Sequence, residues 1–456
     1  YPNYVSTRNY KSDFTEKAMV SLFGRFSYNY KQRYLMEFTF RRDGSSTFGE
    51  GNRWANFPSI AVGWTFSEEP FIKRWTGKWL NWGKIRGSYG TSGQIFTDAY
   101  LAHGLMRVES ATFLGTSGVS SARPISPDLT WEKTEQYDLG LDMDMFNYRL
   151  NLKLDYYYKR TSSLIHGVDL PGGLSPFDRR TENAMAVSNE GIELELQADI
   201  FRESAVSWRM KLNASRNWNR FEKSNTGKDV DGLVIGRPLN GLYVYAHDGF
   251  YESEDDVPRY YTVNGDDTYW GGITAKSEVS GQLGNYILRD FNDDKNPSSY
   301  YAGSTLPLMH GGWINEVMWK NFDLNVLVNY TIGRKMINAR VANSFDPLQG
   351  ITKMLDYKDL VFWEKPGDRA NMPAWGNTVR AMLDTNIEKV HSVSLKQLTV
   401  GYNLPKRLAA KTGFSGVRCF MTVENLFYLS NYSVENPEVI DVYTGVDNGK
   451  SYPLPR

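Results

Sequence analysis

The sequence has almost no cysteine, no net charge and no long apolar run. Cys419 is the only cysteine among 456 residues, which excludes an internal disulfide framework and a zinc site built from cysteines. Lys plus Arg and Asp plus Glu both number 52, so the formal net charge is zero. Overall charge therefore gives no argument for nucleic acid or an anionic membrane surface as a partner. No segment approaches the ~18 consecutive apolar residues of a transmembrane helix.

Motifs for catalysis are also missing. The five histidines are scattered at His103, His166, His247, His310 and His391, and none forms the His-x-x-x-His spacing of a metal site. The chain has no Gly-x-Ser-x-Gly elbow and no phosphate-binding loop. The sequence therefore indicates no chemical step, and we expect a protein that is not an enzyme.

Aromatic residues and glycine are abundant. The chain holds 29 Tyr, 13 Trp and 40 Gly, a composition typical of all-β proteins with many short segments. The mean hydropathy of −0.49 would suggest a water-soluble protein. That reading does not apply to membrane β-barrels, because each spanning strand alternates a lipid-facing and a polar lumen-facing side chain.

Strict alternation of apolar and polar residues recurs in runs of about ten residues. In residues 148–159, Leu and Tyr side chains alternate with Arg, Asn, Lys and Asp, and residues 136–145 show the same pattern. A tight hairpin at Phe146-Asn147 is expected between these two runs. Further runs of this kind lie at residues 22–30, 60–67, 192–200, 208–215, 322–331 and 417–424.

A soluble β-sandwich or propeller would also show this alternation, but three details favour a membrane barrel. The strands have the ~9–11 residues needed to cross a bilayer at a tilt. Aromatic residues gather at strand ends, as interfacial girdles do. Short connections at residues 31–33, 146–147, 202–207 and 320–321 alternate with long polar loops, which matches short periplasmic turns and long extracellular loops.

We therefore predict an all-β fold, a transmembrane antiparallel up-and-down β-barrel with about 12 strands in this chain. Residues 68–80 are expected to form a short amphipathic helix at the periplasmic rim, capped by Ser67. An open sheet cannot lie in lipid with unpaired edges, so this chain is expected to be part of a plugged barrel of ~22 strands. The long loops are expected at residues 44–57, 92–130, 165–187, 225–306, 333–390 and from 430 onward.

Several segments resemble one family of transporters. They are residues 21–30 (SLFGRFSYNY), 33–46 (RYLMEFTFRRDGSS), 53–69 (RWANFPSIAVGWTFSEE), 84–93 (KIRGSYGTSG), 321–329 (NFDLNVLVN), 395–405 (LKQLTVGYNLP) and 423–427 (VENLF). Spread in order over nearly the whole chain, they resemble the SusC-like (RagA-type) TonB-dependent outer-membrane transporters, in the C-terminal part of the barrel.

The resemblance implies an outer-membrane importer with an N-terminal plug, a SusD-like surface lipoprotein as its lid and energy from the TonB-ExbB-ExbD complex. It also implies that the plug and the first strands lie upstream of Tyr1, where the chain opens without Met or a signal peptide. A closing strand is expected to follow Arg456. Residues 1–456 are thus expected to be the C-terminal portion of the barrel domain, in contact with outer-membrane lipid.

Two acidic segments are candidate binding sites. Asp290, Asn292, Asp294 and Asn296 place oxygen ligands at alternate positions, as calcium loops do. Lys295 stands where such a loop needs glycine, and the alternative is that this segment is a solvated acidic turn. Ca²⁺ is the one candidate cofactor, and no other cofactor is expected. A second set suggests paired-carboxylate chemistry or simply a solvated loop: Asp248, Glu252, Glu254, Asp255 and Asp256.

Aromatic residues cluster in the longest expected loop. Aromatic faces stack on sugar rings and on peptide side chains alike. We expect some of Tyr243, Tyr245, Tyr251 and Trp270 to contact substrate, with loop packing or contact with the lid protein as the alternative.

The sequence thus predicts active import of an oligomeric nutrient, a glycan or an oligopeptide. A passive porin and a soluble all-β carbohydrate-binding module are the two alternatives. Loop composition suits glycans and peptides equally.

Overall fold

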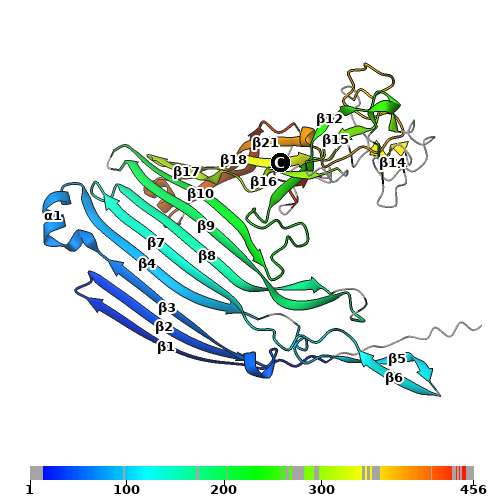
Figure 1. Cartoon of the computed structure of the whole chain (residues 1–456). Coiled ribbons are helices and arrows are strands. Elements are labelled where there is room, and N and C mark those ends of the chain that lie inside the picture. Colours follow the sequence, from blue (N-terminus) through cyan, green and yellow to red (C-terminus); the bar gives the residue numbers. More distant parts are fainter. Residues whose placement is uncertain are drawn as a thin grey trace, which may run out of the picture. The chain divides into compact units, whose positions relative to one another are not determined.

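The computed structural model describes residues 14–447 except for 96–97, 114, 171–172, 174, 203, 258, 262–266, 270–281, 292–296, 341, 343–344, 347–349, 352–359, 412, 434–437, 439–440 and 442–443. Long antiparallel strands dominate this part of the chain (Figure 1). Within it, no helix is long and apolar enough to cross a membrane.

The main sheet contains twelve long strands of the described residues, which confirms the expected number. They are β1 (Met19–Tyr30), β2 (Tyr34–Ser45), β3 (Trp54–Trp64), β4 (Leu80–Gln94), β7 (Glu132–Met145), β8 (Leu150–Asp169), β9 (Arg179–Phe201), β10 (Val206–Ser224), β17 (Met309–Trp319), β18 (Phe322–Asn338), β21 (Ile387–Asn403) and β22 (Arg418–Ser430). They neighbour one another in this order, with β23 (Val446–Asp447) beside β18. The up-and-down order is therefore the predicted one.

The shorter elements lie between these strands. The short strands are β5 (Met106–Phe113), β6 (Thr116–Ser121), β11 (Gly241–Tyr245), β12 (His247–Phe250), β13 (Arg259–Tyr261), β14 (Asp267–Tyr269), β15 (Tyr286–Leu288), β16 (Ser299–Ser304), β19 (Phe345–Asp346) and β20 (Gly350–Ile351). The helices are α1 (Pro70–Thr76), α3 (Lys406–Lys411) and the 3-10 turns η1 (Glu50–Asn52), η2 (Phe66–Glu68), η3 (Glu254–Asp256) and η6 (Asp384–Asn386).

The chain forms two units. Unit 1 comprises Tyr1–Asn147, Lys153–Gly191 and Asn219–Arg237, and unit 2 comprises Tyr148–Leu152, Ile192–Trp218 and Pro238–Arg456.

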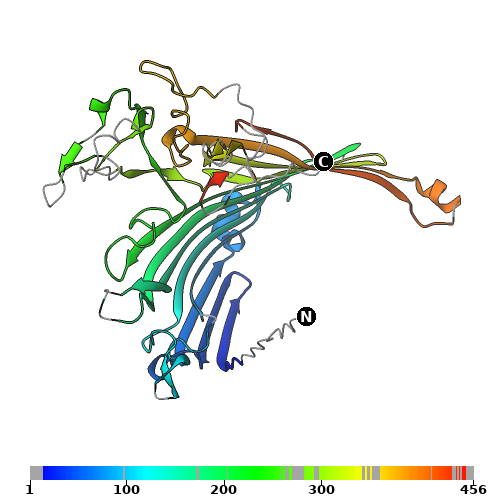
Figure 2. The same cartoon turned by 90° about the vertical axis from the view of Figure 1, so that its right-hand side faces the viewer.

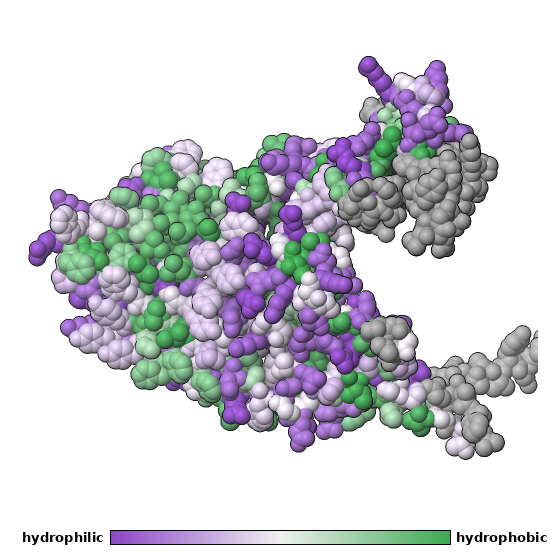
Figure 3. Space-filling view, in the orientation of Figure 1, coloured by the Kyte–Doolittle hydropathy of each residue, from purple (hydrophilic) through white to green (hydrophobic). Residues whose placement is uncertain are grey.

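In unit 1, the two faces of the sheet differ sharply in polarity. Met36 pairs with Val62, Val62 pairs with Gly87, and Gly87 pairs with Leu139. These pairs place one apolar row across the sheet from β2 to β7. Val62 and Leu139 are 52% and 57% exposed, so no described part of the chain covers this row. Figure 3 shows apolar side chains gathered over the left-hand part of the long strands, toward the end where α1 lies.

The opposite face of unit 1 carries paired polar groups. Arg86 Nε donates to an oxygen of Asp142 at 3.0 Å, and the same guanidinium pairs with Asp155. Ser88 Oγ donates to Asp138 at 3.0 Å. Opposite charges on neighbouring strands therefore neutralise one another along this face.

Unit 2 repeats the arrangement in β10, β17, β18, β21 and β22. Leu324 pairs with Val400, and Val400 pairs with Met421, on the apolar face. The polar face holds three ion pairs: Arg209 with Asp199 at 2.7 Å, Lys211 with Glu316 at 2.9 Å, and Arg418 with Asp323 at 3.2 Å. Figure 2 shows the β21–β22 hairpin in orange with α3 at its turn.

Gly311 lies where neighbouring strands of unit 2 leave no room for a side chain. It pairs with Ala214 on one side and Tyr330 on the other. The hydroxyl of Tyr330 reaches across it to donate to the carbonyl of Asn213 at 2.7 Å. An aromatic ring laid over a strand glycine is a known way of covering the exposed backbone there.

Four expected loops are shorter than predicted. The strand β4 continues to Gln94 inside the loop expected at residues 92–130, and the loop expected at residues 333–390 is cut by β18, which continues to Asn338, and by β21, which begins at Ile387. The loop expected at residues 44–57 is cut at both ends, because β2 continues to Ser45 and β3 begins at Trp54. The loop expected at residues 165–187 is largely strand, because β8 continues to Asp169 and β9 begins at Arg179. Backbone pairing continues here, but residues 179–183 are all polar and residues 184–187 are all apolar, so the alternation that indicates a strand disappears.

The helix expected at residues 68–80 exists, but both of its ends were predicted wrongly, and Leu80 is already the first residue of β4. The helix α1 covers Pro70–Thr76, with Glu69 as its N-cap and Pro70 in the first turn. Ser67 is buried in the preceding 3-10 turn η2 and does not cap the helix. Proline at the first helical position fixes the start, because its ring presets the helical φ and its missing N–H is not needed there.

The connections between strands are hairpin turns and structured loops. Phe146, Asn147 and Tyr148 have φ of 55°, 57° and 59° in the predicted tight turn. In unit 1, Phe48, Phe57, Leu129 and Trp131 form a small loop core. In unit 2, residues of two long loops form a larger core, which contains Phe250, Tyr286, Leu288, Trp363 and Leu383.

Candidate functional site

The aromatic residues expected to bind substrate fall into three environments. Tyr243 and Tyr245 lie on β11, which pairs with β16. The ring of Tyr243 packs 5.7 Å from that of Tyr301, and Tyr245 packs against the unit 2 loop core. Both rings are half-buried, so each keeps part of its surface available. Substrate contact by these two residues stays a prediction.

Tyr251 is built into the loop. Its side chain is 3% exposed and packs with Val257 and Ile287, and burial raises the pKa of its hydroxyl. In this arrangement the ring supports the loop and offers no face to a ligand. Trp270 lies outside the described residues.

The candidate calcium loop is only partly described. Asp290 lies just after β15 and accepts a hydrogen bond from Ser298 Oγ at 3.1 Å. Asn292, Asp294 and Asn296 lie outside the described residues. The described residues include no group of three His, Cys, Asp or Glu side chains placed to hold a metal ion, and the calcium site stays a prediction.

Two of the acidic residues in the longest loop have structural partners. Asp248 accepts from Arg289 Nε at 2.9 Å, and this contact lowers the pKa of its carboxyl. Asp256 closes a capping box with Ser253 at the start of η3, and the backbone N–H of Ser253 lowers its pKa. A carboxyl group with a lowered pKa is ionised at neutral pH and is a poor general acid. These two acids therefore stabilise the loop.

Sequence reasoning missed a polar cavity of about 240 Å³ in unit 2. Its lining residues come from four separate parts of the chain, at residues 247, 286, 342 and 360–386. No local sequence motif therefore predicts the cavity. Its polar groups come from His247, Asn371, Arg380, Thr385 and Asn386. A cavity lined by amides, a guanidinium and a hydroxyl can bind the hydroxyl or carbonyl groups of a sugar or a peptide.

His247 is the most constrained group in this cavity. Its ring packs edge-on against Phe250 and Tyr286, with centroids 5.1 and 5.0 Å away. Its Nε2 is buried and has no hydrogen-bond partner among the described residues. Burial lowers the pKa of this imidazole below its usual 6.5, because a charged ring loses hydration there. At neutral pH His247 is therefore uncharged.

We expect the loop around His247 to open more readily as the pH falls. The opened loop binds a proton below about pH 6.5, whereas the closed loop binds it only at lower pH. The closed state therefore loses stability from pH 6.5 downward, and the loss levels off below the lowered pKa of His247. Hydrogen exchange at residues 247–250 and 384–386 should speed up from pH 7.5 to 5 after correction for the intrinsic rate.

The variant His247→Gln should remove most of this pH dependence. His103→Gln is the matched control, because His103 is exposed and belongs to unit 1, so it should leave the loop unchanged. A loop whose corrected exchange stays flat across this pH range in the native protein would contradict the expectation.

A second cavity, of about 310 Å³, lies in unit 1. Its ionic centre is Asp231, which accepts from His166 Nε2 at 2.9 Å and Arg179 Nη2 at 2.8 Å. Arg179 is the main cause of the lowered pKa of Asp231. Lys228 also lines the cavity, but the three carboxylates of Asp169, Asp229 and Asp231 outnumber its two permanent cations, so this cavity is the more acidic of the two. No sequence motif predicts this cavity, because His166 and Asp231 are 65 positions apart in the chain.

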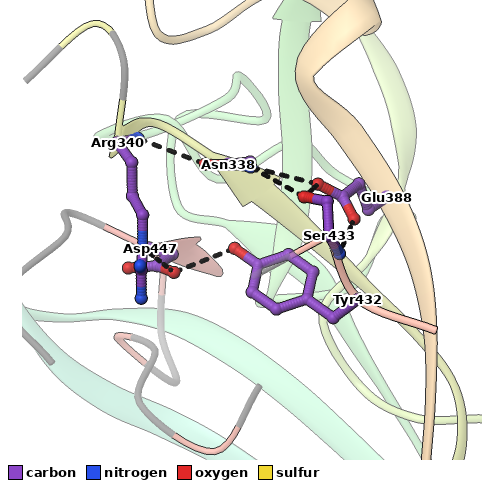
Figure 4. Close-up of polar contacts among 6 residues, drawn as sticks. All are labelled: Asn338, Arg340, Glu388, Tyr432, Ser433 and Asp447. Atoms are coloured by element: carbon purple, nitrogen blue, oxygen red, sulfur yellow. Dashed lines mark hydrogen bonds and ion pairs between the residues drawn. The ribbon is translucent and has the colours of Figure 1, made fainter. Parts of the chain in front are cut away.

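The segment 430–447 is fastened to the top of β18 in unit 2. Val446 and Asp447 pair in parallel with Ile337 and Asn338. Asp447 is 1% exposed and accepts from Arg340 Nε at 3.0 Å and from the Tyr432 hydroxyl at 2.9 Å. Figure 4 shows this network together with Asn338, Glu388 and Ser433. We call the described residues of 430–447 the latch segment.

Comparison with known proteins places the chain in one family. Residues 1–343 match the family described as "TonB dependent receptor-like, beta-barrel". The chain is 29% identical to TonB-dependent receptor P26 of Formosa agariphila, over 100% of this chain and 47% of that protein. It is 28% identical to TonB-dependent receptor SusC of Bacteroides thetaiotaomicron, over 100% of this chain and 44% of that protein. The chain thus spans less than half the length of these curated relatives.

Solved structures agree on the fold. The structure of the RagAB peptide transporter superimposes with a TM-score of 0.73 at 24% identity, over 94% of this chain and 45% of that one. These matches confirm the resemblance to SusC-like transporters seen in the sequence. The alternating strands, their up-and-down order and the match over residues 1–343 lead to one conclusion: this chain belongs to the TonB-dependent receptor-like β-barrel family.

Proposed function

We propose that this chain forms part of an outer-membrane barrel that actively imports an oligomeric nutrient. The observation that carries the proposal is the two-faced sheet of each unit. Apolar rows such as Leu324, Val400 and Met421 lie on one face, and mutually neutralised ion pairs lie on the other. Leaving such rows in water is unfavourable by ~25 cal/mol per Å², whereas hydrocarbon accommodates them and a water-filled lumen accommodates the ion pairs.

The energy source and the lid protein follow from the family. TonB-dependent receptors draw on the TonB-ExbB-ExbD complex, and SusC-like members work with a SusD-like surface lipoprotein. We extend both partners to this protein. The polar cavity beside His247, together with Tyr243 and Tyr245, is the proposed place of first substrate contact on the outer side.

The cargo is a glycan or an oligopeptide. The neighbour named the RagAB peptide transporter favours a peptide, but its 24% identity to this chain supports the shared fold and not the same cargo. The similarity to SusC does not decide between the two classes. Amide, hydroxyl and aromatic groups bind both classes.

Uptake by living cells tests the proposal. Deleting the gene in its native host should abolish growth on one class of oligomer and leave growth on the corresponding monomer intact. The full-length gene should restore growth. Because import is powered, removing TonB should cause the same loss as deleting the gene.

Two results would point to the alternatives. Oligomer uptake that persists without TonB, or steady conductance of the intact protein in planar bilayers, would support a passive porin. Full solubility of the intact protein without detergent would support a soluble binding module.

A further inference from the structure

The helix α1 carries exposed aromatic side chains on one side. Phe71 and Trp75 are one helical turn apart and are 61% and 85% exposed, so they share a face. Trp79, just after the helix, is also exposed. Large aromatic residues this far from a core mark an interaction surface when they are contiguous.

Positive charge surrounds these aromatic residues. Lys73, Arg74 and Lys78 are all exposed, and one carboxylate, Glu68, lies 3.6 Å from Lys73. The surface therefore combines aromatic rings with a net positive charge. Arg and Lys pair strongly with phosphate oxygens, and Trp prefers the level of lipid headgroups.

The helix is held firmly in its place. Before it, Glu69 accepts from the Tyr34 hydroxyl at 2.7 Å and lies 3.5 Å from Arg33. After it, the carbonyl of Trp79 accepts from the backbone N–H of Phe146 at 2.7 Å. The α1 segment is thus joined to the β1–β2 turn on one side and to the β7–β8 turn on the other. Its aromatic side chains are presented without a further ordering cost.

The neighbouring turns of unit 1 show the same chemistry. Tyr30, Tyr34 and Phe146 are exposed, and Lys31 Nζ lies 5.1 Å from the centre of the Tyr30 ring. Figure 1 shows α1 at the turn end of these strands. The α1 surface therefore continues a band of aromatic and cationic groups at the end of the sheet.

We propose that α1 is an interfacial anchor that inserts Phe71, Trp75 and Trp79 among the phospholipid headgroups of the membrane leaflet at the short-turn end of the barrel. In this position Arg74 and Lys78 bind lipid phosphates. Three partly exposed rings offer roughly 400 Å², below the ~800 Å² per partner of a stable protein interface. Binding to a lipid layer does not require this minimum buried area on α1 alone, because the same lipid layer also covers the adjacent aromatic band.

This inference rests on the proposal that the sheet crosses a bilayer, and the experiment separates the two. In the full-length protein with every other cysteine, including Cys419, replaced by serine, single spin labels are attached at Trp75→Cys, Trp313→Cys or Trp375→Cys. Trp313 lies on the apolar face of β17 opposite Val328, and Trp375 is an exposed residue of a long loop. In phosphatidylglycerol nanodiscs, collision rates with oxygen and with a water-soluble nickel chelate report the surroundings of each label.

The label at Trp75 should favour oxygen. Its ratio of oxygen to nickel collision rates should lie between the ratios at Trp313 and Trp375. Preference for nickel equal to that at Trp375 would overturn the anchor, and shielding from both reagents would indicate a protein partner and overturn it too. Preference for nickel at Trp313 would instead refute the membrane-crossing sheet.

A second variant tests the role of charge. Adding Arg74→Glu and Lys78→Glu should move the Trp75 label toward water, and the shift should be larger in phosphatidylglycerol than in phosphatidylcholine, because only the former is anionic overall. An unchanged oxygen preference in both lipids would overturn the phosphate contacts.

Discussion

The variant Gly311→Ala should prevent the unit 2 strands from packing as they do in the native protein. A Cβ at this position would lie 2.0 Å from the backbone carbonyl oxygen of Asn213 and 2.6 Å from the Tyr330 hydroxyl. Backbone atoms of a paired strand cannot move aside without breaking the ladder between β10 and β17. Overpacking of rigid sites costs ~1–3 kcal/mol or more, and we expect about 3 kcal/mol. A lowered midpoint of urea unfolding in lipid would measure it.

The adjacent variant Gly312→Ala is the matched control. A Cβ there would meet its nearest atom, an oxygen of the Asn329 side chain, at 3.4 Å, which is ordinary contact. The change should alter stability by less than about 1 kcal/mol. Equal losses for both variants would mean that strand entropy, and not the close approach at Gly311, sets the cost.

The variant Asp447→Ala should release the latch segment from β18. It removes a buried acceptor from Arg340 and from the Tyr432 hydroxyl, whose pKa is raised chiefly by burial. Removing one partner of a buried charge pair costs ~3–5 kcal/mol. Arg340 keeps some access to water, so we expect about 3 kcal/mol, which corresponds to roughly hundredfold faster exchange. The readout is hydrogen exchange at the amides of Ile337 and Ala339, which donate to the latch segment.

Glu438→Gln separates this effect from a general loss of charge. Glu438 lies in the latch segment and pairs with Lys396 at 2.8 Å, but its side chain is exposed. Exposed ion pairs contribute ~0–1 kcal/mol, so exchange at Ile337 should change by less than about fivefold. If Asp447→Ala had no larger effect than Glu438→Gln, the buried network would not be what fastens the segment.

The sequence predicted the long strands of the main sheet well, because the two faces of each strand differ in polarity and this difference imposes alternation. Residues 322–331 illustrate this, since Leu324 and Val326 take one face and Asp323 and Asn325 the other. The same rule failed at residues 165–187, where β8 and β9 stay paired but polar and apolar residues come in separate runs and do not alternate. Strand pairing depends on backbone hydrogen bonds, which leave no trace in side-chain polarity.

Loop cavities were beyond sequence reasoning for a different reason. His247 acquires its surroundings from Tyr286, Arg380 and Asn386, which no local rule brings together. The cluster of Tyr and Trp residues in the loop was visible in the sequence. Composition alone does not distinguish Tyr245, with a half-buried ring, from Tyr251, which is buried. That difference arises from how the loop folds on itself.

The strand β18 runs continuously from the main sheet of unit 2 into the loop cores at its C-terminal end. Its 17 residues extend over roughly 56 Å, whereas a crossing uses about ten residues. An irregularity in pairing with β21 falls between Thr331 and Arg334, and beyond it Met336 and Ile337 are fully buried in loop cores. In the proposed importer, β18 therefore ties one loop core of unit 2 to the part of the sheet that crosses the bilayer. The movement that admits cargo would then have to occur in other loops, because tilting of this core would pull the spanning strand with it.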